Sequence, residues 1–370
     1  MNHFTKGNIK LVGHFGNVRR ESTPQPPPKG ESYPASFFKF IVHRSSFIIL
    51  LTLIAISSFG QRQEDKLRFF EIPDTLNKTR FWALNGSIVV GYTGTMSLLS
   101  VAWYKGFERS SFHFFNDFGE WEDMDKAGHF FSTYFQSKWT RSLYQWTGVK
   151  ERRAAYMGAI GGSIFQGGIE VLDGFSAKWG ASAWDIVFNT AGAATFLGQE
   201  LLWEEQRISL KLSAHRPNYS TDPIQANNSM ATTTLRERAD DLYGTSIAEV
   251  VLKDYNGLTI WASGNISAFI QKEDHKFPKW LNLAVGYSAE NVYGGFGNGW
   301  SIGDDNYTPS ADLYPRYRQF LLAPDVDFTR IPTKSKGLKI FFGLLNIIKI
   351  PSPALEVNSL GKVKFHPVYF

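Results

Sequence analysis

The sequence predicts a mainly α-helical protein: a helical bundle of apolar, small-residue-rich helices with a C-terminal α+β region that contains a small antiparallel β element. Two observations predict this fold class. Within residues 79–214, long apolar segments recur, and each carries one thin row of polar side chains at helical spacing. Within residues 235–370, several short stretches alternate between apolar and polar residues as strands do. The polar, turn-rich segment 215–234 is predicted to link the two regions.

The N-terminal part is not expected to belong to the fold. Residues 1–44 are basic and Pro-rich, so they bury too little apolar surface to offset their ordering entropy and are predicted to be disordered. Residues 45–60 have the layout of a signal peptide: a short apolar run followed by small residues, with a cut predicted before Gln61. The alternative for this segment is an N-terminal membrane anchor.

Composition narrows the function classes. The chain has no cysteine, so an exported form has no disulfide framework and no site for lipid attachment at a bacterial signal cleavage point. The formal net charge is +5, without a basic stripe that carries interleaved aromatic residues. A nucleic-acid partner is therefore not expected.

The first predicted helix covers residues 82–104, a stretch without charge that is long enough for a bilayer. Trp82, Trp103 and Tyr104 stand where interfacial aromatic residues belong. The central helix of a soluble bundle would show a similar pattern, and its small residues would allow close packing in either setting. Both interpretations stay open at this point.

The second predicted helix begins near Asp123 or Asp125, either of which can cap its first turn. Steps of three and four from Asp125 reach His129, so an acid and a histidine lie one turn apart on a narrow polar stripe. The same stripe continues through Ser132, Thr133 and Gln136. The other faces of this helix are aromatic, which is not typical of a helix on a protein surface.

Two further helices repeat this design over residues 152–175 and 182–203, the second with Ser182 as its cap. The first of them also has a seam of small residues at every fourth position, which lets a neighbouring helix approach closely. The seam consists of Ala154, Gly158 and Gly162. The polar stripes consist of Ser163, Gln166, Glu170 and Asp173 on one helix, and of Asp185, Asn189, Gly192 and Gln199 on the other.

The three stripes are predicted to face one another, because ionisable groups that point into a bundle or a bilayer need partners. The candidate catalytic residues are Asp125, His129, Glu170 and Asp185, and the candidate metal ligands are His129, Glu170 and Asp185. The predicted polar network around them adds Gln166, Asp173 and Asn189. No zinc motif, phosphate-binding glycine loop or nucleophile elbow accompanies these residues.

The C-terminal region gives weaker signals. Segments 257–269 and 280–288 alternate like strands but also suit short helices, whereas 318–331 and 362–370 are more typical of antiparallel strands. Residues 335–350 are apolar on most sides and end before a proline, which favours a helix that is buried or in contact with a membrane.

Three segments in order, "MDKAGHFFSTY", "GGIEVLDGFSAKWGASAWDIVFNTAGA" and "LLWEEQRISLKLS", resemble domain-of-unknown-function family 2279. The proteins of this family are described as predicted periplasmic lipoproteins, with long forms in Bacteroidetes. The resemblance covers about residues 85–215 and implies an exported protein in the periplasm or outer membrane of a Gram-negative cell envelope. It implies no catalytic residues, and this chain departs from the description because it lacks a cysteine.

Two function classes remain. The first is a non-catalytic, membrane-associated envelope protein without a cofactor, in which the buried polar network sets helix packing and a membrane or envelope component is the partner. The alternative is a metal-dependent or acid/base hydrolase that acts on a lipid-linked or cell-wall substrate through His129, Glu170 and Asp185, with a divalent metal as cofactor. Whether the protein is an enzyme, and whether it has a protein partner, are left open by the sequence.

Overall fold

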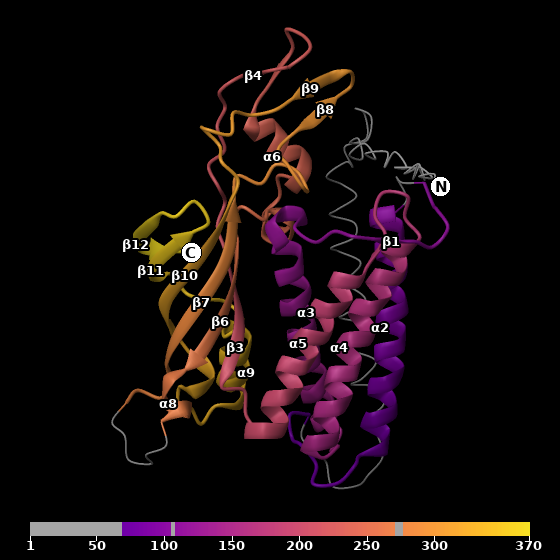
Figure 1. Cartoon of the computed structure of the whole chain (residues 1–370). Helices are drawn as coiled ribbons and strands as arrows, with labels where there is room; N and C mark the ends of the chain where they lie inside the picture. Colours follow the sequence, from indigo (N-terminus) through magenta and orange to yellow (C-terminus); the bar gives the residue numbers. More distant parts are fainter. Residues whose placement is uncertain (1–68, 105–107, 271–276) are drawn as a thin grey trace, which may run out of the picture.

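The computed structural model describes residues 69–104, 108–270 and 277–370. The predicted leader 1–44 and signal segment 45–60 lie outside the described residues. In the described part, four long helices form one layer and a six-stranded sheet lies beside them (Figure 1). The helices are α2 (Lys78–Tyr104), α3 (Met124–Trp146), α4 (Glu151–Gly174) and α5 (Ala183–Trp203).

The sheet has the strand order β12-β11-β10-β7-β6-β3, and all neighbouring strands in it are antiparallel. Its strands are β3 (Ile208–Ala214), β6 (Leu258–Asn265), β7 (Leu281–Glu290), β10 (Tyr317–Val326), β11 (Ser352–Asn358) and β12 (Val363–Tyr369). The helix predicted within 335–350 is α9 (Lys336–Leu345), and a short helix, α8 (Ile266–Phe269), follows β6.

The prediction of a mainly α-helical bundle is therefore wrong. The structure is 44% helical and 23% strand, and its sheet is one of its two main layers. The segments 257–269 and 280–288, which suited either state in isolation, become central strands because they pair with each other and with β3 and β10. Such pairing joins residues that are distant in sequence, and local periodicity does not reveal it.

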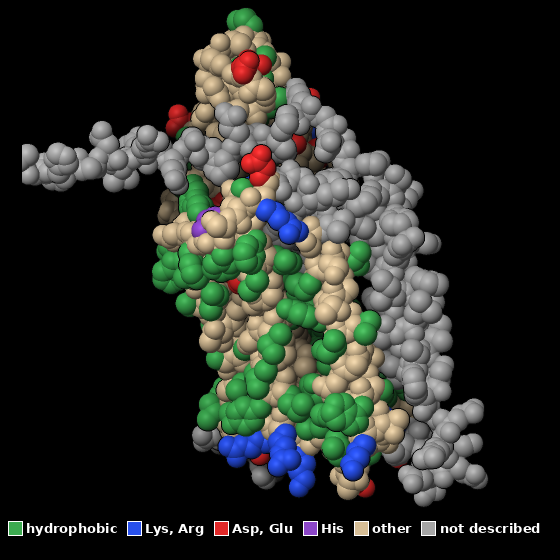
Figure 2. All heavy atoms as spheres, turned by 90° about the vertical axis from the view of Figure 1, so that its right-hand side faces the viewer, with side chains coloured by type: hydrophobic (Ala, Val, Ile, Leu, Met, Phe, Trp, Pro, Cys, Tyr) green, Lys and Arg blue, Asp and Glu red, His purple; other side chains and the backbone are tan. Residues whose placement is uncertain are grey.

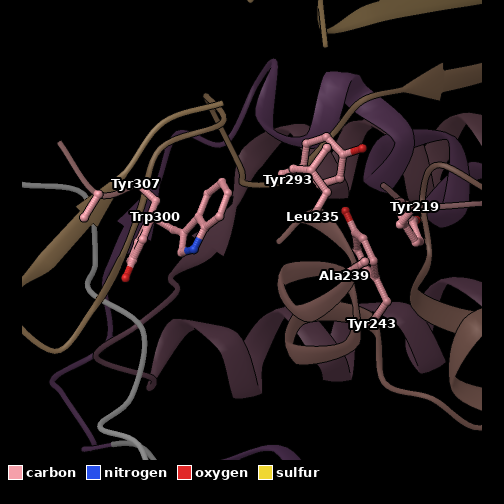
Figure 3. Close-up of a cluster of buried hydrophobic side chains, with 8 residues drawn as sticks. Tyr219, Leu235, Ala239, Tyr243, Tyr293, Trp300 and Tyr307 are labelled. Atoms are coloured by element: carbon pink, nitrogen blue, oxygen red, sulfur yellow. The ribbon is translucent and has the colours of Figure 1, made fainter. Parts of the chain in front are cut away.

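A smaller group of elements covers one end of the sheet (Figure 1). It contains β4 (Ile224–Gln225), β5 (Thr232–Thr233), β8 (Trp300–Ile302), β9 (Asp305–Tyr307), α6 (Leu235–Tyr243) and α7 (Ile247–Lys253). Figure 3 shows its core, in which Leu235, Ala239 and Tyr243 of α6 lie near the rings of Tyr293 and Trp300. Tyr219, from the segment 215–234, is buried in the same core. This packing fixes the segment between β3 and α6 against the small group of elements.

Helices α3 and α4 approach closely through the small-residue seam predicted from the sequence. Ala154, Gly158 and Gly162 are all buried. A Cβ atom on Gly158 would lie 2.5 Å from the carbonyl oxygen of Ser137, and one on Gly162 would lie 2.5 Å from the Ser137 hydroxyl. The seam thus brings the polar stripes of α3 and α4 within reach of each other.

Helix α2 packs more loosely, with Leu84 buried against Tyr144 and Ala154 while Trp82 is exposed. In the part of the chain that the structure describes, none of the helices has both the length and the apolar character needed to cross a membrane.

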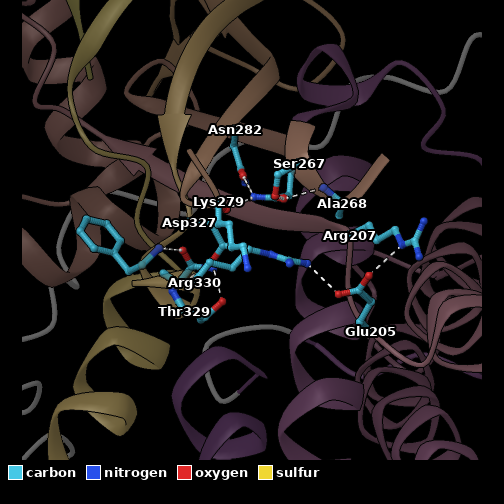
Figure 4. Close-up of polar contacts among 12 residues, drawn as sticks. Glu205, Arg207, Ser267, Ala268, Lys279, Asn282, Asp327, Thr329 and Arg330 are labelled. Carbon is cyan, nitrogen blue, oxygen red and sulfur yellow. Dashed lines mark hydrogen bonds and ion pairs between the residues drawn. The ribbon is translucent and has the colours of Figure 1, made fainter. Parts of the chain in front are cut away.

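The lower end of the helical layer is tied to the sheet by charged side chains. Glu205, just after α5, pairs with Arg207 at 2.9 Å and with Arg330 at 2.8 Å (Figure 4). Arg330 ends the short helix η2 (Phe328–Arg330), which follows β10. The two layers are therefore joined near this end by ion pairs as well as by apolar packing.

Candidate functional site

The candidate residues come together where α3 and α5 begin, at the end of the helical layer that carries β1 and β2. β1 (Phe114–Phe115) pairs in parallel with β2 (Ala181–Ser182). This pairing brings the segment before α3 next to the first turn of α5, so Asp117 reaches Ser182 although 65 positions separate them. Helix α4 contributes Glu170 from its last two turns.

Six residues form a charged cluster: Asp117, Asp125, Lys126, His129, Glu170 and Asp185. Lys126 lies at its centre, and the Lys126 side chain is 0% exposed. Its ammonium group lies 2.6 Å from Asp117 Oδ2, 3.0 Å from Asp125 Oδ2 and 2.6 Å from Asp185 Oδ1. One cation thus bridges three carboxylates from the loop, from α3 and from α5. A buried ammonium group is tolerable only with such partners.

Ser182 connects this cluster to the start of α5. Its hydroxyl donates to Asp117 Oδ1 at 2.5 Å and accepts the backbone N–H of Asp185 at 3.0 Å, which is the predicted N-cap. The backbone N–H of Ser182 donates to Glu170 Oε2 at 3.2 Å. The predicted capping of α3 is different, because Asp123 occupies the N-cap position but accepts from Gly119 N–H instead of from its own helix.

His129 lies beside Lys126 and contacts all the other candidate acids. Its Nε2 atom is 3.8 Å from Asp125 Oδ1 and 3.7 Å from Asp185 Oδ2, while its Nδ1 atom is 3.6 Å from Glu170 Oε1. Asn189 Oδ1 lies 3.1 Å from Nδ1 and also accepts the Thr133 hydroxyl at 2.9 Å. The polar stripes of α3, α4 and α5 therefore meet at this histidine.

The environment shifts the proton affinities of these groups in opposite directions. Burial raises the pKa of Glu170 to about 8 and, with the neighbouring Asp125, that of Asp185 to about 7. Burial acts in the same sense on Asp125, but His129 and Lys126 outweigh it, so the pKa of Asp125 is lowered. Burial alone would lower the pKa of His129, yet Asp125, Asp185 and Glu170 raise it.

The arrangement has two chemical capacities. Glu170 and Asp185, whose pKa values are raised to about 8 and about 7, each lie within 4 Å of the His129 ring, an arrangement that suits general acid/base catalysis. In addition, Asp125, His129 and Asp185 each offer one ligand atom, and these atoms lie within 4.8 Å of one another. Nitrogen and carboxylate oxygen suit a divalent transition metal. Lys126 contacts Asp125 Oδ2 and Asp185 Oδ1, so the other oxygen of each of these two carboxylates faces His129 Nε2.

The remaining predicted network residues lie close by. Gln166 is buried one turn before Glu170, and Asp173, half-buried in the last turn of α4, acts on Glu170 as a nearby negative charge. Asn189 is buried, and its Nδ2 atom has no hydrogen-bond partner among the described residues. Ser163 differs from the predicted stripe because it is exposed.

Sequence analysis missed Lys126, Asp117 and Tyr255 as members of the cluster. Lys126 stands between two candidate residues in "DKAGH", so its proximity was visible but its central position was not. Asp117 follows no helical period, and the Tyr255 hydroxyl reaches Asp125 Oδ1 at 3.4 Å from a segment 130 positions away. Only tertiary structure brings these two residues to the site.

Comparison with known proteins relates this region to a protein family. The model of the family DUF2279, described as a predicted periplasmic lipoprotein, matches residues 113–198, which include β1 through most of α5 and the whole charged cluster. No curated protein and no solved structure matches the chain.

The match confirms the family and the location predicted from the sequence. The protein carries the DUF2279 region and is an exported protein of the cell envelope. The family's description includes the word lipoprotein, but this sequence has no cysteine to which a lipid could be attached. Because the family model ends within α5, the match does not include the sheet.

Proposed function

We propose that this protein is a non-catalytic, membrane-associated component of the cell envelope, in which the charged cluster fixes the packing of α3, α4 and α5. The observation that carries the proposal is the position of Lys126. Its buried ammonium group pairs with Asp117, Asp125 and Asp185 within 3.0 Å, so a cation of the protein itself offsets part of the negative charge of three carboxylates. An internal cation of this kind supplies the partner that buried carboxylates need.

The proton affinities fit the same role. Near neutral pH, Lys126 supplies positive charge and Asp125, with its lowered pKa, stays ionised, while the neighbouring acids raise the pKa of His129. Glu170 and Asp185, whose pKa values are raised to about 8 and about 7, take up protons in part. Proton uptake removes excess negative charge from the interior, where an unpaired charge is strongly unfavourable. Networks of this kind set the register of packed elements in several proteins.

Metal analysis of the purified full chain, combined with thermal unfolding, tests this proposal. We expect less than stoichiometric metal after exposure to zinc, manganese or magnesium and buffer exchange, and a lower melting temperature for His129→Asn and Asp185→Asn. Glu151→Asn, an exposed site outside the cluster, is the control for handling. Stoichiometric metal that both cluster variants lose, without loss of melting temperature, would contradict a purely structural network.

A second candidate is a metal-dependent or acid/base hydrolase that acts on a lipid-linked or cell-wall substrate through His129, Glu170 and Asp185. The convergence of ligand atoms from Asp125, His129 and Asp185 favours it. The aromatic pair Phe118 and Trp184, with ring centroids 4.7 Å apart, is exposed next to the cluster and offers an apolar surface for a lipid tail. Hydrolysis of polyprenyl-diphosphate or cell-wall fragments that wild type performs and Glu170→Gln abolishes would establish this candidate instead.

A further inference from the structure

The inner face of the sheet combines a small apolar core around Trp261 and Leu321 with buried charged and polar residues. Lys211, Asp325, Glu356 and Gln319 all lie on this face, which a sheet in a water-soluble domain usually keeps apolar. Lys211 and Asp325 form an ion pair of 2.8 Å at which both side chains are 0% exposed. The inner face thus pairs its main charges internally, although Gln319 Oε1 and Asp325 Oδ1 have no hydrogen-bond partner among the described residues.

The outer face of the same strands is apolar and exposed. Phe320 and Val285 on adjacent strands are 50% and 55% exposed, and Phe365 on β12 is 64% exposed. The pattern is continuous because Phe320 pairs with Tyr287 on one side and with Val357 on the other. Further exposed members of this face are Leu283, Leu322, Leu355 and Val363.

On β3 the corresponding face is already covered by apolar side chains. Leu210 of β3 is buried against Tyr134 of α3 and Phe196 of α5. The outer face is therefore built for apolar contact, and the start of α3 extends the cover to Leu258 of β6 and Ala289 of β7 through Met124. Val285, Phe320 and Phe365, elsewhere on the outer face, stay exposed.

The helical layer carries a second exposed apolar face, which points away from the sheet. Figure 2 shows hydrophobic side chains spread over this face, with a row of Lys and Arg at its lower end. Exposed apolar side chains on the helices of this layer include Val89 of α2, Ile160 and Ile164 of α4 and Val187 of α5, with Trp82 at the start of α2 and Trp184 at the start of α5. Monomers in water rarely expose large contiguous apolar surface.

The basic residues border this face at the turn between α3 and α4. Lys150, Arg152 and Arg153 are exposed there and have no ion-pair partner among the described residues. The start of α2 lies at the same end, because Asn77 N–H donates to Thr147 O at 2.8 Å. Basic side chains next to an apolar face, with tryptophan at its border, suit the phosphates and the interfacial region of a lipid layer.

We propose that lipid acyl chains cover both apolar faces, so that the helices and the sheet together form one lipid-contacting belt. The belt is defined by Val89, Ile160, Ile164 and Val187 on the helices and by Val285, Phe320, Val357 and Phe365 on the sheet. Each helix and the sheet contribute only one face to the belt. The belt therefore does not require any helix to be apolar on all sides. A second protein copy would cover one face, whereas lipid covers faces on different sides of the molecule.

This proposal rests on the membrane association in the proposed function. It makes that association specific, because the belt is the contacting surface and lipid acyl chains are the partner. The absence of cysteine allows a direct test, since a single introduced cysteine is the only one in the sequence. A nitroxide label is attached to full-length Ile160→Cys, Val285→Cys and Phe365→Cys. Met230→Cys, 84% exposed on the loop between β4 and β5, is the control outside the belt.

The labelled proteins are reconstituted into vesicles of phosphatidylethanolamine and phosphatidylglycerol, and their collision rates with oxygen and with a water-soluble nickel chelate are measured. We expect the nickel collision rate to fall severalfold at all three belt positions and to stay unchanged at Met230→Cys. Oxygen collisions should rise at the belt positions, because oxygen concentrates in acyl chains.

The outcomes separate this proposal from the proposed function. A protein that floats with the vesicles while its belt labels stay open to the nickel chelate would overturn the belt and leave membrane association standing. A protein that does not float with vesicles would overturn both. Protection at Ile160→Cys without protection at Val285→Cys would remove the sheet from the belt, and protection that depends on protein concentration without lipid would replace lipid by a second copy.

Discussion

Two of the places where the molecule buries charge differ in how many groups share that charge. In the sheet, Lys211 pairs with one acid, Asp325, and neither side chain is exposed. In the helical layer, Lys126 contacts three acids, and His129 adds a fourth in Glu170. The sheet pair has one arrangement of charge, whereas the helical cluster can redistribute protons among several acids.

This difference indicates separate roles. A single closed pair holds β3 to β10 across the interior, with Ser263 donating to Asp325 at 2.6 Å. The helical cluster lies nearer to solvent, since the Asp125 side chain is 30% exposed, and some of its groups titrate near neutral pH. Stability measurements on matched variants can sharpen or refute this contrast.

The largest effect is expected for Lys211→Met. It removes the ion pair of Asp325 and leaves only the nearby charge of Lys349 to act on this buried carboxylate, with no second acid in the pair to share a proton. We therefore expect a loss of about 3 to 5 kcal/mol in the free energy of unfolding. The double variant Lys211→Met/Asp325→Leu should recover most of this loss, because it removes both charges. Urea unfolding of the three proteins measures both values. A double variant as unstable as the single one would show that the pair contributes more than mutual neutralisation.

Lys126→Met is expected to have a smaller and pH-dependent effect. Without the ammonium group, Asp185 and Glu170 can take up protons, as their raised pKa values already indicate. We expect a loss of about 3 kcal/mol at pH 8 and a smaller loss at pH 5. Urea unfolding at the two pH values measures the difference. Equal losses at both pH values would mean that the acids do not redistribute protons, and the contrast with Lys211 would fail.

The variant Glu170→Gln tests whether Glu170 takes up one of these protons. The pKa of Glu170 is raised from 4.5 to about 8 in the folded protein, so its contribution is fully present below about pH 4.5 and is lost as the pH rises through about 8. The glutamine variant cannot ionise and avoids this loss. Relative to wild type, it should gain about 2 kcal/mol between pH 5 and pH 8, within the limit of about 1.4 kcal/mol per pH unit.

Urea unfolding across that pH range provides the measurement, with Glu151→Gln as a control for removing an exposed acid outside the cluster. A stability difference between Glu170→Gln and wild type that does not change with pH would show that Glu170 is ionised throughout, and the proposed charge balance would be wrong.

The helical part of the site was largely predictable from the sequence, because helical spacing is a local property. Asp125 and His129 lie one turn apart on α3, and the spacing alone placed Glu170 and Asn189 on stripes that turn inward. The small-residue seam indicated which side of α4 packs closely against a neighbouring helix, and α3 lies on that side. A buried charge needs partners, and this requirement predicted that the stripes meet.

The sheet and its charge pair were not predictable by the same reasoning. Lys211 and Asp325 stand 114 positions apart on β3 and β10, which are not neighbours in the sheet. The outward apolar residues of β7 and β10 alternate with small or polar residues, so the sequence indicated strands without indicating which face is buried. The assumption that apolar residues face inward holds for Trp261 and Leu321 but fails for Val285 and Phe320, which are exposed on the outer face.

The smallest effect is expected for Ser182→Ala, which separates capping from the charge network. Its hydroxyl caps α5 and donates to Asp117, whereas Ser335 caps α9 and its hydroxyl accepts the N–H of Leu338 without contacting a buried acid. Loss of a cap costs about 1 kcal/mol, so Ser335→Ala supplies the cost of the cap alone. Ser182→Ala should lose more than this, because Asp117 then keeps Lys126 as its side-chain partner but loses a hydrogen bond to a charged oxygen. Thermal unfolding of the two variants side by side gives the comparison. Equal losses would mean that the hydrogen bond from Ser182 to Asp117 does not stabilise the cluster. Ser182, which the pairing of β1 with β2 brings next to Asp117, would then stabilise only the start of α5.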